Sequence, residues 1–200
     1  MRCSLGVPLA GYALVVCVES IRIRIGFRTV LFIQERFGFA MEGTVRAVDV
    51  ADAILEQLLP GKKVGAEKFH SLLYLCQGIC LGVAGRVLFD GSIEAWRDGP
   101  IVPDVHYLHR GADLLSYGSL PEGSRKELDS ASLRIVDYVI ANYGLERGDF
   151  LQRWVCGRDT PWDLAFSRGG CYSEIDVDTM HGWFARDFER ASRGGRFIDV

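Results

Sequence analysis

The sequence predicts a mainly α-helical, compact domain built around one buried central helix and carrying one small β-hairpin. An apolar run with helical spacing occupies residues 66–83. Shorter amphipathic segments with helix start and stop residues lie on both sides of it. Around Asp90-Gly91, two short strand-like runs flank a turn dipeptide. With 200 residues, 48% hydrophobic and 24% charged, the chain suits one globular domain with or without an appendage.

The first two predicted helices are residues 48–59 and residues 66–83. The first has apolar residues at nearly helical spacing, and Pro60-Gly61 ends it. The second is apolar over more than one stripe, as in a helix that is largely buried. Gly85 follows it at the position where glycine commonly ends a helix. The glycines inside this second helix indicate close packing against a neighbouring helix.

The predicted hairpin pairs residues 86–89 with residues 92–96 across the Asp-Gly turn, which is a strong two-residue hairpin signal. The remaining helices follow from apolar periodicity and from start signals such as Thr160 ahead of Pro161. We expect them at residues 105–110, 121–143, 147–155, from 161 onward, and at 176–192.

The cysteines predict buried, reduced thiols. The chain has six of them, and Cys76 and Cys80 stand four apart on the apolar face of the central helix. A metal clip would require tighter pairs with matching partners, whereas free cysteine is among the most often buried residue types. Mostly reduced thiols indicate a cytoplasmic protein.

Residues 1–40 differ in character from the rest, and three explanations stay open. The uncharged run 3–18 has sixteen residues, shorter than the about twenty that a membrane span requires. With Arg2 ahead of it, this run fits a signal or anchor segment, but no small-x-small cleavage site ends it. Met41 opens a stretch that looks like a natural protein start, so we favour a start codon assigned too far upstream. A genuine extension is the third explanation, and residues 41–200 form the domain in all three.

The domain is acidic, which argues against general nucleic-acid binding. The whole chain has a formal charge of -3 and a pI of about 5.8. Residues 1–40 hold five of the 23 basic and two of the 26 acidic residues, so residues 41–200 carry 18 basic and 24 acidic residues, a net charge of -6. A nucleic-acid binder normally presents a basic patch or stripe.

The histidines do not indicate a metal or catalytic site in the sequence. His106 and His109 are three apart and compatible with a metal pair, but no matched Cys or Glu partner is evident. We interpret them as surface or half-buried histidines. His70 lies beside the apolar face of the central helix, and we expect it at the edge of the core. We predict no catalytic residue, no metal and no cofactor.

Two blocks of sequence carry a family resemblance. Residues 68–74, Lys-Phe-His-Ser-Leu-Leu-Tyr, contain the Lys and the Leu-Leu-Tyr of a helix motif. Residues 93–103, Ile-Glu-Ala-Trp-Arg-Asp-Gly-Pro-Ile-Val-Pro, contain the stronger motif. On these blocks the chain resembles the Panacea domain, also called the SocA-like antitoxin domain. His70 and Ser71 stand where the family motif has Gln and Lys. The resemblance covers about Val48 to Phe188, including Pro161-Trp162 and the last helix.

The resemblance implies an antitoxin of a toxin–antitoxin system that neutralises a partner toxin by direct protein binding, without catalysis. Some relatives also act as adaptors that deliver the toxin to a Clp-type protease. We expect the toxin to be encoded by an adjacent gene, and we expect neither a membrane partner nor direct contact with nucleic acid. The partner-binding residues expected from the matched motifs are Lys68, Glu94, Trp96, Arg97, Asp98 and Pro100.

Two other functions stay open as alternatives. Glu94, Asp98 and Asp104 lie around the hairpin and would serve a small hydrolase as an acid/base pair, although a solvated rim is the simpler interpretation. That enzyme would need a concave pocket with carboxylates of strongly shifted pKa. A DNA-binding regulator is disfavoured by the net charge of -6 over residues 41–200.

Overall fold

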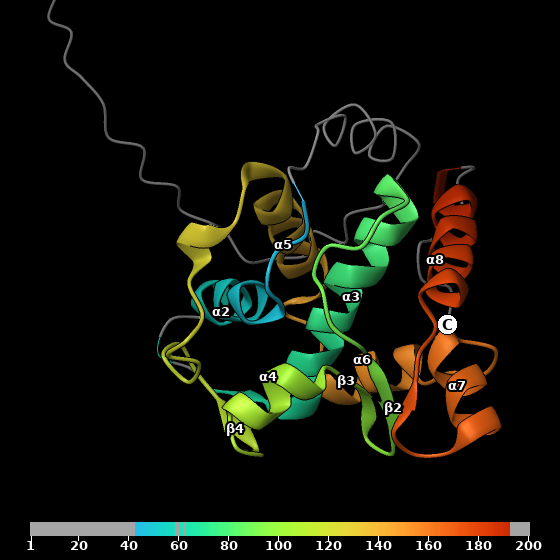
Figure 1. Cartoon of the computed structure of the whole chain (residues 1–200), viewed down its shortest axis with the longest axis horizontal. Helices are drawn as coiled ribbons and strands as arrows, with labels where there is room; N and C mark the ends of the chain where they lie inside the picture. The colour runs from blue at the N-terminus through green and yellow to red at the C-terminus, as the bar shows by residue number, and fades with distance from the viewer. Residues whose placement is uncertain (1–42, 59–60, 62, 193–200) are drawn as a thin grey trace, which may run out of the picture.

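The computed structural model of this chain describes residues 43–58, 61 and 63–192 (Figure 1). It confirms the predicted fold class, a compact and mainly α-helical domain around a buried central helix with a small hairpin. The predicted extension at residues 1–40 lies outside the described residues. The α-helices are α2 (Ala47–Gln57), α3 (Ala66–Ala84), α4 (Pro103–Leu108), α5 (Ser130–Tyr143), α6 (Gly148–Val155), α7 (Pro161–Gly169) and α8 (Val177–Ser192).

Two small antiparallel sheets accompany these helices. β1 (Val64–Gly65) pairs with β4 (Leu114–Leu115), just ahead of α3. The second sheet has the order β3-β2-β5, with β2 (Glu94–Trp96) in the middle. β3 (Gly99–Ile101) and β5 (Ser173–Glu174) pair with it on either side.

Helix α3 forms the centre of the core, as its apolar pattern predicts. Every residue from Phe69 to Leu81 is buried, so the helix has no solvent-facing stripe over that length. Figure 1 shows it between α2 and α5 on one side and α8 on the other, and α6 and β3 pack on it as well. Gly85 ends it in the left-handed conformation at φ 66°, with its N–H bonded to the carbonyl of Leu81.

The glycines of α3 allow α8 to approach closely, which confirms their predicted use. A Cβ at Gly78 would overlap the ring of Phe184, and a Cβ at Gly82 would lie 3.0 Å from the backbone carbon of the same residue. Phe184 is fully buried. The helix pair therefore depends on side chains being absent along one strip of α3.

The hairpin forms further along the chain than predicted. The strands are β2 and β3, with Trp96 opposite Gly99 and the turn at Arg97-Asp98 rather than at Asp90-Gly91. Phe89 instead forms a parallel bridge to Val45. The tertiary partners of residues 88–90 therefore override the local turn signal, and Pro100 is tolerated because β3 is an edge strand.

The third long helix is shorter than predicted, because α5 begins at Ser130 and not at residue 121. Asp129 caps it by accepting a hydrogen bond from the N–H of Ser132 at 2.6 Å. Ahead of the cap, the chain is held against α2, where a carboxylate oxygen of Asp49 accepts a hydrogen bond from the N–H of Ser124 at 2.9 Å. A continuous helix would forfeit these contacts.

The C-terminal helices follow their predicted signals. Thr160 caps α7 through a hydrogen bond from the N–H of Asp163, and Pro161 occupies the first turn. Met180 and Phe184 of α8 point into the core. Among the described helices, none combines the length and the apolar character that a bilayer crossing requires.

Candidate functional site

The motif residues of the hairpin meet an exposed group of aromatic side chains at one end of α3. Ring centroids lie 4.9 Å apart between Tyr172 and Trp96, 4.7 Å between Trp96 and His106, and 5.8 Å between His106 and Tyr107. We call these four residues the aromatic row. Figure 1 shows the elements that carry them, β2, α4 and the segment after α7, at the same end of the molecule.

Hydrogen bonds fix the centre of the aromatic row. The indole N–H of Trp96 donates to Oε2 of Glu94 at 2.8 Å. The carbonyl of Trp96 accepts a hydrogen bond from the indole N–H of Trp162 at 3.0 Å. Trp96 is half-buried, so it presents part of its ring to solvent on a backbone anchored to α7.

Tyr172 adopts a backbone conformation that residues other than glycine rarely take. Its φ is 72°, in the left-handed region that costs a bulky residue about 1–2 kcal/mol. Its N–H donates to the carbonyl of Ala95 at 2.9 Å, which holds the backbone in place, and the ring meets Trp96 edge-on. Strained backbone of this kind is often found at functional sites.

The six expected partner-binding residues fall into two places. Glu94, Trp96, Arg97, Asp98 and Pro100 lie together on the hairpin, with Arg97 and Asp98 exposed at its turn and Pro100 buried in β3.

Lys68 lies elsewhere, at the start of α3. Its ammonium donates to the carbonyl of Gly144 at 2.7 Å, at the end of α5. Partial burial lowers the pKa of Lys68, and the charge of Glu146 opposes that shift. Lys68 therefore joins α3 to α5, apart from the hairpin.

Three histidines converge beside the aromatic row. One ring nitrogen from each of His70, His106 and His109 lies within 4.8 Å of the others. His70 comes from α3, His106 from α4, and His109 from the C-terminal cap of α4. His70 and His109 are 1% and 6% exposed, whereas His106 is half-buried. We call these residues the histidine cluster.

The contacts of the histidine cluster favour one arrangement of the ring protons. The N–H of Val102 donates to Nδ1 of His70 at 3.5 Å, and Nε2 of His70 lies 3.1 Å from Nε2 of His109. In the tautomer in which Nδ1 accepts this long hydrogen bond, Nε2 of neutral His70 carries the proton and donates to His109. The proton of neutral His109 is then on Nδ1, which is buried and finds no hydrogen-bond partner among the described residues.

Burial and mutual repulsion favour the neutral rings of His70 and His109. The pKa of His70 is lowered to about 3, mainly by burial and in addition by repulsion from His109 and His106. Burial also lowers the pKa of His109, as does His106, while a backbone hydrogen bond opposes the shift. Neutral imidazole has a free lone pair, which is the form that binds metals.

Sequence reasoning missed the histidine cluster. The spacing of His106 and His109 was compatible with a metal pair, but their third partner comes from a helix 39 residues away from His109 in the chain. The expectation of surface or half-buried histidines holds for His106 and is wrong for His109, which is buried. His70 is fully buried rather than at the edge of the core.

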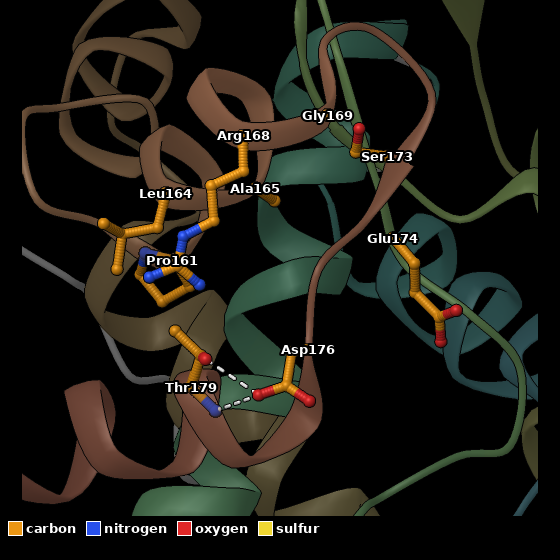
Figure 2. Close-up of a pocket in the computed structure, with 9 residues that line it drawn as sticks. All are labelled: Pro161, Leu164, Ala165, Arg168, Gly169, Ser173, Glu174, Asp176 and Thr179. Atoms are coloured by element: carbon orange, nitrogen blue, oxygen red, sulfur yellow. Dashed lines mark hydrogen bonds between the residues drawn. The ribbon is translucent and has the colours of Figure 1, made fainter.

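A small open pocket of about 240 Å³ borders the sheet of the hairpin at β5. It is lined by residues of α7, β5 and the start of α8, and Glu94, Asp98 and Asp104 do not contribute to it. Figure 2 shows Asp176 on this pocket joined to Thr179 by two hydrogen bonds, each 2.7 Å long. Those bonds are the main cause that lowers the pKa of Asp176, and they make this carboxylate the cap of α8.

Comparisons of this chain with protein-family models, with curated proteins and with solved structures give no match.

Proposed function

We propose that the chain is an antitoxin that neutralises a partner toxin by binding it directly through the aromatic row and the hairpin turn. The resemblance to the Panacea domain supports a toxin as the partner. The aromatic row is the observation that carries the protein-binding part of the proposal, because it joins the motif residue Trp96 to two exposed tyrosines.

The exposure of this row is what a protein interface requires. Tyr107 and Tyr172 are 69% and 64% exposed, although both are large aromatic side chains. Tyrosine and tryptophan are enriched at interfaces and among the residues that dominate binding energy. Because Glu94 bonds the indole of Trp96 and Trp162 bonds its carbonyl, little conformational entropy would be lost at Trp96 on binding.

The charge around the row favours a basic partner. Between Glu94 and Tyr107, the carboxylates Glu94, Asp98 and Asp104 outnumber the single cation, Arg97, and Asp98 and Asp104 are exposed. The net charge of -6 over residues 41–200 also favours a basic partner. Complementary charge steers association and selects the partner. A toxin that acts on nucleic acid would carry the matching basic surface.

The test is co-expression of the full chain with each neighbouring open reading frame, scored by growth and by co-purification. We expect one neighbour to be toxic alone and to be rescued by this chain in a stable complex. Quantifying the toxin in rescued cells, with and without Clp-type proteases, separates blocking from delivery. If no neighbour is toxic and nothing co-purifies, the proposal fails.

Surface variants locate the interface within the same assay. Tyr107→Ala and Tyr172→Ala are expected to weaken the complex at least tenfold, which corresponds to about 1.4 kcal/mol. Tyr117→Ala is the matched control, because Tyr117 is also 64% exposed but makes none of the ring contacts of the row. If Tyr117→Ala weakens binding as much as the other two, the row is not the interface.

A further inference from the structure

We propose that the histidine cluster, His70, His106 and His109, is a binding site for a divalent transition-metal ion, with Zn²⁺ as its best match. The three rings are brought together only by the fold. β3 packs along α3 and leads directly into α4, which places the face of α4 that carries His106 and His109 over His70.

One pair of nitrogen atoms is already near the separation that a metal imposes. Two nitrogens bound to one tetrahedral Zn²⁺, each at about 2.0–2.1 Å, lie roughly 3.3 Å apart. Nε2 of His70 and Nε2 of His109 are separated by 3.1 Å. All three donor atoms lie within 4.8 Å of one another.

An unpartnered buried nitrogen of the histidine cluster gives a second indication. Nδ1 of His106 and Nδ1 of His109 are buried, and neither has a hydrogen-bond partner among the described residues. A buried polar atom without a partner costs about 1–3 kcal/mol, and such an atom often marks the place of an ion. Nδ1 of His109 keeps its proton when Nε2 is the ligand, so of these two atoms only Nδ1 of His106 counts as an indication of the ion.

Metal binding would replace two contacts of His70, the hydrogen bond of its Nε2 to His109 and the long contact of its Nδ1 with Val102. Coordination through Nε2 of His70 moves the ring proton to Nδ1, which then faces the N–H of Val102. The present distance between those atoms is 3.5 Å, beyond the usual range for a hydrogen bond from N–H. The free energy gained from the bonds to a metal is much larger than the free energy of such a contact.

The ligand set selects the class of metal. Three imidazoles favour zinc, copper, nickel or iron, whereas Mg²⁺ and Ca²⁺ require oxygen ligands. No fourth His, Cys, Asp or Glu of the described chain joins the group. Three protein ligands with the fourth position left for water or another molecule is a common arrangement for Zn²⁺ in proteins. Zinc binding here does not require that the chain be an antitoxin.

The test uses the full chain, stripped with EDTA and then dialysed, titrated with ZnCl₂ by calorimetry and with CoCl₂ by absorption spectroscopy. We expect one Zn²⁺ per chain at this site and a higher Tm in its presence, because an ion that binds only the folded state stabilises it. The cobalt spectrum should show imidazole ligation without thiolate charge transfer, which excludes the cysteines as ligands.

Two histidine variants make the result specific. His106→Ala, at the half-buried position, should weaken Zn²⁺ binding at least tenfold and abolish the rise in Tm while leaving the far-UV circular dichroism unchanged. His181→Ala is the control, because His181 is exposed on α8 outside the cluster, and it should bind like the parent chain. Thiolate ligation of cobalt, the absence of Zn²⁺ binding, or unchanged binding by His106→Ala would overturn the proposal.

Discussion

Nε2 of His70 and Nε2 of His109 lie 3.1 Å apart, although 39 residues separate them in the chain. His70 belongs to the buried central helix, and His109 caps the short helix that follows the hairpin. Two imidazoles at this distance cannot both be charged without strong repulsion. Together with burial, the contact favours the neutral form of both rings in the folded protein, and it joins α3 to the end of α4.

The stability of the metal-free protein should fall as the pH falls below about 6.5. The pKa of His70 is lowered to about 3 in the folded protein from an ordinary value of 6.5. Between these two pH values the unfolded chain therefore binds a proton at His70 that the folded chain does not bind. The contribution of His70 to the free energy of unfolding is fully present above pH 6.5. It decreases toward pH 3, by at most about 1.4 kcal/mol per pH unit.

Urea unfolding in EDTA at pH 7, 6, 5 and 4 measures this loss. Carboxylates also titrate in the lower part of the range, so the informative quantity is the difference between the parent chain and His70→Gln. We expect a shallower pH dependence in the variant and an unchanged one in His181→Gln. Equal slopes for the parent chain and His70→Gln would contradict the prediction.

Gly78→Ala should destabilise the fold by about 1–3 kcal/mol or more, because overpacking a tight interface forces side chains and backbone to shift. An added Cβ would overlap the buried ring of Phe184. Gly182→Ala is the matched control on α8, since its Cβ would meet nothing within 4 Å. That control should be neutral or stabilising by up to about 1 kcal/mol. Thermal unfolding measures both variants: the Tm should fall for Gly78→Ala and stay the same or rise for Gly182→Ala. An unchanged Tm for Gly78→Ala would contradict the prediction.

Gln77→Leu should cost several kcal/mol, because Gln77 satisfies three buried backbone groups. Its Oε1 accepts hydrogen bonds from the N–H groups of Leu88 (2.9 Å) and Phe89 (3.1 Å), and its Nε2 donates to the carbonyl of Phe89. Each group left unpaired costs about 1–3 kcal/mol. Gln57→Leu removes one exposed side-chain bond to Asp137 and should cost less than about 1 kcal/mol. Similar urea midpoints for the two variants would rule out this role of Gln77.

Thiol alkylation should distinguish the described cysteines. Cys171 is exposed and Cys76 and Cys80 are buried. Burial raises the pKa of Cys80 to about 11 and that of Cys156 to about 12, and the thiolate is the reactive form. Iodoacetamide at pH 8 should therefore label Cys171 first in the native protein and all four in urea. Peptide mass mapping measures the order in which the cysteines are alkylated. Early labelling of Cys80 would show that α3 is not buried.

The helices of this domain were predictable because their signals are local. The apolar run of α3, its left-handed Gly85 and the Thr160-Pro161 start of α7 each act within a few residues. The mainly helical fold class and the buried thiols of Cys76 and Cys80 followed from the same patterns. Where a helix boundary depended on contacts with another element, as at Asp129, the prediction placed it too early.

Only the tertiary structure decided the position of the hairpin and the composition of the site. Asp90-Gly91 is the stronger local turn signal, yet Gln77 and Val45 bind the backbone of residues 88–90 and leave the turn to Arg97-Asp98. By itself, the sequence determined which segments are helical and which helix is buried, because periodicity and caps are properties of neighbours along the chain. The meeting of His70 with His106 and His109, and of Trp96 with Tyr172, depends on packing between distant segments, which no local pattern encodes.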